Sequence, residues 1–249
     1  GDDKQLSNVL DDIRDSKISD EDIDCLNQCR FHDVDEDATV LYTHKRDVAF
    51  HNRQMLENLP WKMYELQAEI WKEFPENMKP NNEFIQLKVW AKVMMVINDQ
   101  KGRWVNWSIW VVKAFSLEDP KPCITVEIDG VPYEVEKHLR RYAPMRINDK
   151  GKYEEKTLWT FLQFPLQLAY AITIHKSQGL TFEECIMNIE KVFVWWQWYT
   201  ALSRVKSLKG LKILGSVDKN KLYFDPRVED FKKVCAINKL WDRIIACIP

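Results

Sequence analysis

Apolar residues in the first third of the chain recur at helical spacing. Four apolar residues between positions 6 and 13 fall on one face, which predicts an amphipathic helix over residues 4–15. A second short helix is predicted after Ser19, because a serine followed three positions later by an acidic residue, Asp22, can cap a helix start. Helical spacing returns over residues 45–59.

From about residue 62 to residue 165 the pattern changes to short runs rich in β-branched and aromatic residues, separated by turn residues. Strands are predicted over 85–97, 104–115, 122–128 and 131–136. Asp129 and Gly130 stand between the last two runs, and Asp-Gly is a strong hairpin signal. Several short strands in close succession predict a small barrel or sandwich.

The remaining segments alternate between strand and helix patterns. Strands are predicted over 37–43, 168–174, 184–190 and 211–217, and helices over 196–205 and 226–246. The sequence therefore predicts an α/β domain interrupted by a small β insertion.

Composition places the chain among globular proteins. Of its 249 residues, 45% are apolar and 30% are charged, and no apolar run reaches the roughly 18 residues of a membrane helix. The acidic start of the chain does not resemble a signal peptide, so we expect a cytoplasmic protein with no membrane partner. All six cysteines are expected to be reduced thiols, and no metal site is expected, since Cys25 and Cys29 have no second ligand pair nearby.

Charge is unevenly distributed. Residues 1–37 carry 13 acidic and 4 basic side chains, whereas residues 137–156 carry seven basic and three acidic ones. Residues 204–212 carry four basic side chains and no acidic one. Basic patches of this kind suit a phosphate backbone, and a solvated face is the alternative interpretation.

The polar segment 175–179, His-Lys-Ser-Gln-Gly, directly follows a predicted apolar strand. Ligands of α/β sheets usually bind at loops that follow strands. The side chains of 175–178 can donate hydrogen bonds to phosphates, and Gly179 lets backbone amides approach an anion. A plain strand-to-helix connection would look the same, so both interpretations stay open.

A second cluster lies in residues 199–211, where Arg204 comes near the end of a short predicted helix. A guanidinium is permanently charged and forked, so it suits a phosphate better than an ammonium does. An arginine that reaches a transferring phosphoryl group from a neighbouring domain is a known catalytic device. Taken without further context, this residue is better interpreted as a surface arginine.

Together, the two clusters resemble motifs V and VI of PIF-type DNA helicases, the RecD-like branch of superfamily 1. The matching segments are Tyr170–Thr181 and Tyr199–Val205, with weaker matches at 43–52 and 101–106. The resemblance implies a second RecA-like domain of the P-loop-NTPase type with an inserted small SH3-like β-barrel. The implied divisions are a helical lead-in over 1–36, the RecA-like domain over 37–61 and 165–249, and the insertion over 62–164.

This family couples ATP hydrolysis to 5′-to-3′ movement on single-stranded DNA. The resemblance implies that Arg204 is the arginine finger and that Lys176, Gln178 and Gly179 lie beside ATP. It assigns contacts with single-stranded DNA to Thr43, His44, Asn52, Thr173, His175 and Ser177. Uncharged donors hold a backbone without reading bases, as a translocating motor requires.

The sequence contains no G-x-x-x-x-G-K-[ST] motif, and the Walker B acid and the first RecA-like domain are not found. We therefore expect a fragment that is inactive alone, with ATP and Mg²⁺ bound mainly by a first RecA-like domain that would be its partner. The alternative is a non-catalytic DNA-binding or interaction module of the same fold. A subunit of a RecD-type nuclease complex is a third interpretation.

Several tryptophans stand where the family normally has glycine, in a chain with 11 tryptophans and only 7 glycines. The positions are Trp61, Trp71, Trp90, Trp107, Trp110, Trp159, Trp196 and Trp198. Some lineages read UGA as glycine and others as tryptophan, so one hypothesis is that these are mis-decoded glycines. The others are a genuinely Trp-rich relative and a role in stacking on bases. Positive φ at several positions would favour glycine, and relaxed β geometry would count against it.

Overall fold

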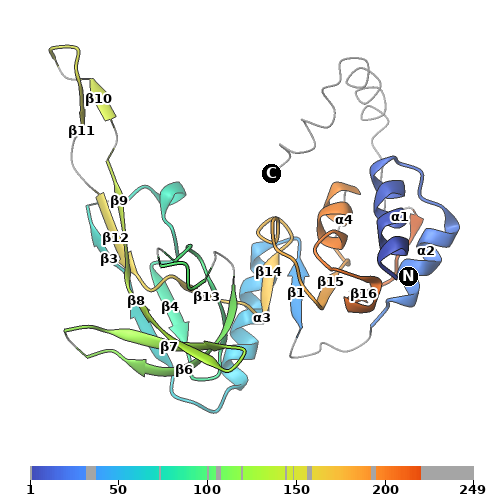
Figure 1. Cartoon of the computed structure of the whole chain (residues 1–249), viewed down its shortest axis with the longest axis horizontal. Coiled ribbons are helices and arrows are strands. Elements are labelled where there is room, and N and C mark those ends of the chain that lie inside the picture. Colours follow the sequence, from blue (N-terminus) through green and yellow to red (C-terminus); the bar gives the residue numbers. More distant parts are fainter. Residues whose placement is uncertain are drawn as a thin grey trace. The chain divides into compact units, whose positions relative to one another are not determined.

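The computed structural model describes residues 2–31, 38–72, 74–99, 101–104, 108–118, 120–143, 145–147, 149–155, 159–191 and 195–219. The chain divides into two compact units (Figure 1). An α/β unit comprises the described parts of 1–51 and 170–249, and a β unit comprises those of 52–169. The helix predicted over 226–246 lies outside the described residues.

The α/β unit is built on a four-stranded parallel sheet with the order β14-β1-β15-β16. Its strands are β1 (Thr39–Tyr42), β14 (Ala171–Thr173), β15 (Cys185–Asn188) and β16 (Leu211–Leu214). Most of their residues are buried, as in parallel sheets that are covered on both faces. Because the strands are parallel, their carboxyl ends share one edge of the sheet.

Four helices belong wholly or partly to this unit: α1 (Asp2–Arg14), α2 (Asp20–Gln28), α3 (Lys45–Asn58) and α4 (Trp195–Leu202). The capping box predicted at Ser19 is confirmed, since its hydroxyl accepts from the Asp22 N–H and the Asp22 carboxylate accepts from the Ser19 N–H. Helix α1 packs against α4 and the 3-10 helix η2 (Leu208–Gly210).

The predicted lead-in segment is tied to the edge of the parallel sheet. Phe31 donates its N–H to Ile213 O at 2.8 Å, and Ile213 donates to Cys29 O at 2.8 Å. The Asn27 amide exchanges two hydrogen bonds of 3.0 Å with the Val217 backbone, as a neighbouring strand would. Residues 2–31 are therefore integrated into the α/β unit.

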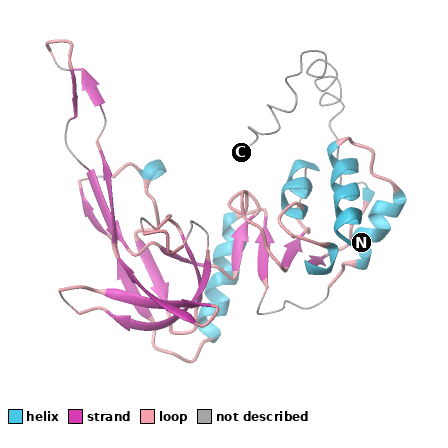
Figure 2. Cartoon of the chain, viewed as in Figure 1, coloured by secondary structure: helices cyan, strands magenta, loops and turns pink. Residues whose placement is uncertain are grey.

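The β unit contains four antiparallel sheets (Figure 2). The largest has the order β13-β5-β6-β7-β8, formed by β5 (Lys92–Met95), β6 (Ile109–Ser116), β7 (Cys123–Ile128), β8 (Val131–Glu136) and β13 (Leu166–Leu168). The hairpin predicted at Asp129-Gly130 joins β7 to β8 and is confirmed. Its core contains Val93, Val112 and Ile124, all completely buried.

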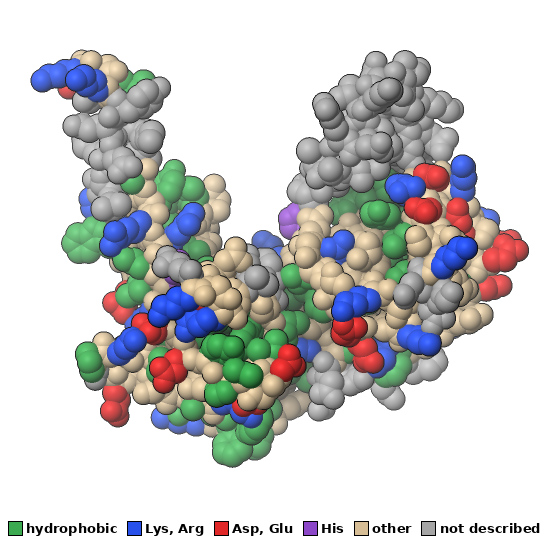
Figure 3. Space-filling view, in the orientation of Figure 1, with side chains coloured by type: hydrophobic (Ala, Val, Ile, Leu, Met, Phe, Trp, Pro, Cys, Tyr) green, Lys and Arg blue, Asp and Glu red, His purple; other side chains and the backbone are tan. Residues whose placement is uncertain are grey.

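Three smaller sheets complete this unit, with the orders β3-β12-β9, β2-β4 and β10-β11. Their strands are β2 (Tyr64–Gln67), β3 (Glu69–Trp71), β4 (Phe84–Leu87), β9 (His138–Tyr142), β10 (Met145–Ile147), β11 (Tyr153–Glu155) and β12 (Trp159–Gln163), and the 3-10 helix η1 spans Glu76–Met78. The single strand predicted over 85–97 is divided by a turn into β4 and β5. Much of the basic stretch at 137–156 forms β9, β10 and β11, and several Lys and Arg side chains lie on the surface of the β unit (Figure 3).

Seven of the eight unusual tryptophans lie in described residues; Trp107 does not. Only Trp90 among these seven has a positive φ, of 69°. Trp110 packs edge to face against Trp104 and Tyr133, with centroids 6.0 Å and 5.2 Å away. The glycine hypothesis called for positive φ at several positions, so this geometry supports it at Trp90 only.

In the part of the chain that the structure describes, no helix combines the length and apolar character needed to cross a membrane.

Candidate nucleotide and nucleic-acid interface

The loop that follows β14 is held by its own polar side chains. Thr173 Oγ1 accepts from the Lys176 N–H at 3.1 Å, and Ser177 Oγ donates to Ile174 O at 2.7 Å. Both side chains are buried, and Ser177 is completely so. Gly179 closes the turn with a φ of 80°, a conformation that favours glycine. Thr173 and Ser177 thus shape the loop, while His175 is exposed on it.

The end of β1 lies directly beside this loop. Ile174 donates its N–H to Tyr42 O at 2.8 Å, so the residues after β1 and those after β14 are neighbours. Thr43 Oγ1 and His44 Nδ1 are 2.8 Å apart, and the His44 carbonyl accepts from the first turn of α3. The structure therefore brings Thr43, His44 and His175 to one edge of the sheet, although the sequence separates them widely.

Positive charge collects at the same edge. Partial burial lowers the pKa of Lys176, and the nearby ammonium of Lys45 lowers it further. Two like charges that repel each other in a partly desolvated place favour an anion between or beside them. Lys45 is the first residue of α3, whose amino terminus carries a partial positive charge as well.

Asn52 does not share this position. It lies seven residues after Lys45 in α3, which is about 10 Å along a helix axis. Its side chain is buried, and it falls within the β unit.

A small cavity of about 90 Å³ lies beside Thr43, lined by Tyr42, Thr43, Asp47, Asn188, Glu190 and Lys191. Lys191 donates to the Asp47 carboxylate at 3.0 Å, which is the main reason that the pKa of Asp47 is lowered. A space of this size holds a few waters rather than a nucleotide.

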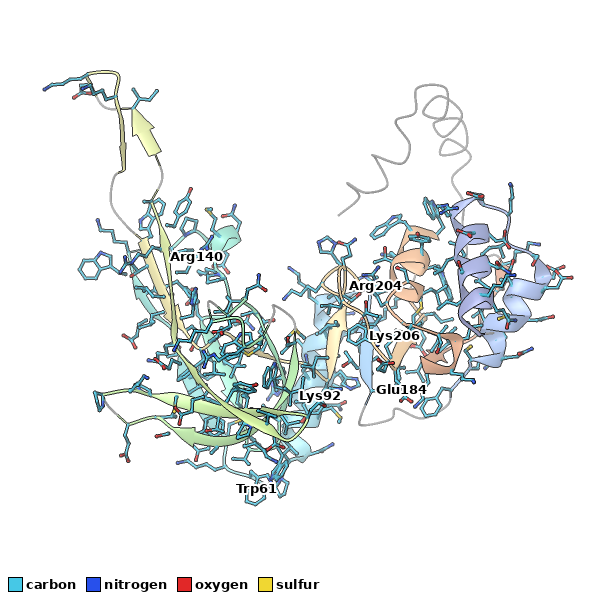
Figure 4. All side chains as sticks on the ribbon, in the orientation of Figure 1. Trp61, Lys92, Arg140, Glu184, Arg204 and Lys206 are labelled. Carbon is cyan, nitrogen blue, oxygen red and sulfur yellow. The ribbon has the colours of Figure 1, made fainter. Side chains whose placement is uncertain are left out.

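Arg204 follows α4, and its guanidinium is bound to two elements (Figure 4). Nε donates to Thr200 O at 2.9 Å, and Nη2 donates to Ser203 Oγ at 2.8 Å. Nη1 reaches the loop after β14, where it donates to Leu180 O at 3.2 Å and to Ser177 O at 3.5 Å. These two carbonyls flank Gln178 and Gly179, so the structure brings those predicted nucleotide-binding residues to the arginine.

The Arg204 guanidinium is half-buried, and no carboxylate in the part of the chain that the structure describes balances its charge. Its hydrogen-bond partners there are three carbonyls and one hydroxyl. Burial lowers the pKa of Arg204, and Tyr199 opposes this shift. The group nevertheless stays charged, because an arginine pKa lies far above neutral pH. A partly desolvated cation of this kind favours an anionic ligand.

Backbone pairing joins the two sequence clusters. Phe182 donates its N–H to Arg204 O at 2.7 Å, and the Lys206 N–H donates to Phe182 O at 3.2 Å. An ion pair between Lys206 and Glu183 lies alongside. The segments 175–181 and 199–205 therefore lie side by side.

Two residues in this site were not predicted as functional from the sequence. Lys45 adds charge beside Lys176, and its position directly after His44 was the available signal. Ser203 binds the Arg204 guanidinium, and it lies within the segment that carries the family resemblance. Neither residue type is distinctive enough to be selected without the contacts.

The relatives found by comparison with known proteins belong to one family. No family model matches the chain. The human ATP-dependent DNA helicase PIF1 is 33% identical over 237 residues, covering 92% of this chain and 35% of the relative. The Pif1 helicase of Bdellovibrio bacteriovorus is 31% identical over 238 residues, covering 93% of this chain and 51% of the relative.

Solved structures agree with these sequence matches. Unliganded Pif1 from Bacteroides aligns with a TM-score of 0.78 at 28% identity, over 94% of this chain and 54% of that chain. The same helicase in complex with ADP-AlF3 and single-stranded DNA aligns with a TM-score of 0.71, over 93% and 54%. The chain thus spans about a third to a half of the relatives it matches. By sequence and by fold, it belongs to the PIF1 family of DNA helicases.

Proposed function

We propose that this chain is the C-terminal portion of an ATP-dependent 5′-to-3′ DNA helicase, supplying an arginine finger and part of the single-stranded DNA track. The observation that carries the proposal is the half-buried Arg204 guanidinium, which no described carboxylate neutralises, beside Gln178 and Gly179. The alignment with a relative solved in complex with ADP-AlF3 and single-stranded DNA supports the same assignment.

In this proposal, Arg204 stabilises the charge that develops on a transferring phosphoryl group. Phosphoryl transfer depends mainly on positioning and charge stabilisation, which a forked guanidinium supplies. Gln178 and Gly179 lie beside the nucleotide, and Lys176 adds positive charge. Because the sequence has no P-loop, ATP and Mg²⁺ are held mainly by a first RecA-like domain.

The DNA track runs along the carboxyl edge of the parallel sheet. Thr43, His44 and His175 contact phosphates there, and Lys45 strengthens the attraction. Thr173 and Ser177 act indirectly by holding the loop, since both are buried. Asn52 would contact the single-stranded DNA about 10 Å farther along α3, once its buried side chain becomes accessible.

The β unit corresponds in this proposal to the inserted SH3-like barrel, and the divisions at 61/62 and 164/165 remain our sequence-based proposal. Helix α3 ends at Asn58, before the 61/62 division, and runs without a break through the boundary between His51 and Asn52 that separates the two compact units. Roles in DNA repair, recombination or telomere maintenance are proposals on the family resemblance alone, and a cytoplasmic location is a proposal on the sequence pattern.

Reconstitution in trans tests the proposed function. The purified chain alone should not hydrolyse ATP, and adding a first RecA-like domain from a relative should give DNA-stimulated hydrolysis. Arg204→Ala should lower that rate by about 10³-fold or more, because the arginine acts on the transition state. The measurement is phosphate release at saturating ATP.

Arg53→Ala is the matched control, since Arg53 is an exposed helical arginine paired with Glu57. It should leave hydrolysis unchanged. Hydrolysis that does not respond to Arg204→Ala would contradict the arginine-finger assignment. Salt-sensitive DNA binding without any rescue of hydrolysis would favour the alternative, a non-catalytic DNA-binding module.

A further inference from the structure

The Arg204 guanidinium connects the end of α4 to the loop after β14. Through Nε it binds Thr200 O, a carbonyl in the last turn of the helix. Helix ends leave such carbonyls without helical partners, and a cation there also complements the helix dipole. The arginine is therefore anchored on α4 from one side.

From the other side, Nη1 bridges the loop. Leu180 donates its N–H to Ser177 O at 2.9 Å, which closes a turn around Gln178 and Gly179. Nη1 donates to the carbonyls at both ends of that turn, Ser177 O and Leu180 O. A single nitrogen thus ties the two ends of the turn together.

We propose that Arg204 clamps the 177–180 turn through these two carbonyls and that Ser203 is a positioning residue for the clamp. This inference rests on the proposed function, because it gives the same side chain a role before it meets a phosphate. The chemical partner that releases the clamp is a phosphoryl group.

The turn carbonyls and a phosphoryl group compete for the same N–H groups of Arg204. A guanidinium has five N–H groups, and the two on Nη1 are both occupied by carbonyls. A forked grip on a phosphoryl group through Nη1 and Nη2 uses one donor of each nitrogen, so in that grip Nη1 must release at least one carbonyl. The turn carries Gln178, and His175 of the same loop lies at the proposed DNA edge, so the clamped turn connects the proposed nucleotide and DNA sites.

Ser203 holds the other end of the guanidinium. Its hydroxyl donates to Thr200 O at 2.9 Å and accepts from Arg204 Nη2 at 2.8 Å. Because its hydroxyl both donates and accepts, Ser203 holds Nη2 at the end of α4, which leaves Nη1 facing the loop. Threonine keeps this hydroxyl, whereas alanine removes it.

Amide hydrogen exchange on the whole chain, without nucleotide, tests the clamp. Arg204→Met keeps an unbranched apolar stem and removes every donor. We expect exchange at Gln178 and Leu180 to rise about tenfold or more, as for the loss of hydrogen bonds from a charged group. Ser203→Ala should raise it less, and Ser203→Thr should restore it.

Ser207→Ala is the matched control, because Ser207 precedes η2 and its side chain forms no capping hydrogen bond. It should leave exchange in the turn unchanged. Amide exchange in β1 and β16 reports general unfolding. If Arg204→Met raises exchange in these strands too, the milder variants Ser203→Ala and Arg204→Lys test the clamp instead. Unchanged exchange at Gln178 and Leu180 in variants that keep β1 and β16 protected would overturn the clamp.

Release is tested in the complex with a first RecA-like domain and ADP–aluminium fluoride. Exchange at Gln178 and Leu180 in the wild-type chain should rise toward the Arg204→Met level when that ligand is bound. If exchange at these two amides does not change while the ligand stays bound, the proposed competition between the turn carbonyls and the phosphoryl group is wrong. If no hydrolysis can be reconstituted, the proposed function fails, while the exchange result on the chain alone still decides the clamp.

Ser203→Ala should also lower kcat in the reconstituted enzyme while leaving KM for ATP nearly unchanged, with rescue by Ser203→Thr. The rate is expressed per folded molecule, so that a residue that merely stabilised the fold would leave kcat unchanged. Equal losses in the alanine and threonine variants would exclude Ser203 as a positioning residue.

Discussion

Trp90 occupies a backbone conformation that side chains rarely adopt, with a φ of 69°. It is 48% exposed, and the Lys113 ammonium lies 3.7 Å from its ring centroid. The left-handed conformation costs a non-glycine residue about 1–2 kcal/mol, and an exposed cation–π contact returns only about 0.5–1 kcal/mol. Trp110 differs in every respect, since it is buried within a strand and packed among aromatic rings.

Trp90→Gly should therefore raise the free energy of unfolding, by up to about 1 kcal/mol. Trp110→Gly should lower it by about 3 kcal/mol or more, because a large cavity remains in the core. Denaturant titration of the two variants measures both effects. If both substitutions stabilise the protein, then the hypothesis of mis-decoded glycines holds beyond Trp90.

At the scale of elements, the connection between β5 and β6 is organised by one carboxylate. Asp99 accepts hydrogen bonds from the N–H groups of Lys101 and Arg103, at 3.1 and 2.9 Å. The Arg103 guanidinium also donates to it, and this contact is the main cause that lowers the pKa of Asp99 to about 2. Arg103 in turn lies 4.4 Å from the Trp104 ring centroid.

Because its pKa is lower in the folded state than in the unfolded state, Asp99 stabilises the fold above its unfolded pKa of about 3.9. That contribution should decline as the pH falls from about 4 to 2. The difference in free energy of unfolding between wild type and Asp99→Asn should be constant near neutral pH and shrink across this interval. Denaturant titrations at several pH values measure it.

Glu118→Gln, which changes an exposed carboxylate after β6, serves as the control. Its difference from wild type should not follow the same course. A difference for Asp99→Asn that persists at pH 2 would contradict the role of the ionised carboxylate.

At the scale of the whole molecule, the acidic and basic segments of the chain lie in different places in the structure. The acidic segment forms α1 and α2 at one side of the α/β unit, while Lys45 and Lys176 meet at the carboxyl edge of its sheet. Charge that is concentrated at one edge attracts a phosphate backbone although the net charge is only −2.

Single-stranded DNA should bind the chain weakly and with strong salt dependence. Lys45→Gln should reduce the slope of log affinity against log salt by about 0.7, the value for one phosphate contact on a single strand. Lys17→Gln, at an exposed lysine between α1 and α2, should leave the slope unchanged. Fluorescence anisotropy with an oligothymidine at several salt concentrations gives both slopes, and equal slopes in all three proteins would remove Lys45 from the track.

Much of the fold was predictable from local pattern. The capping box at Ser19, the helices over α1 and α3 and the Asp129-Gly130 hairpin follow from short-range chemistry and were confirmed. The strands β9 to β11 were not predicted, because His-Leu-Arg-Arg-Tyr and its continuation are too charged to show a strand pattern. Their pairing with β12 and with each other provides what the local pattern lacks.

The sequence by itself determined which residues are candidates for the chemistry. The segments 175–181 and 199–205 contain donors, a flexible glycine and an arginine whose types suit phosphate, and the same segments carry the family resemblance. Only the tertiary structure decided where each of these side chains lies and what it contacts. Burial turns Ser177 inward, and pairing between Phe182 and Arg204 joins segments some twenty residues apart. Such contacts depend on long-range packing, which no local pattern of residues encodes.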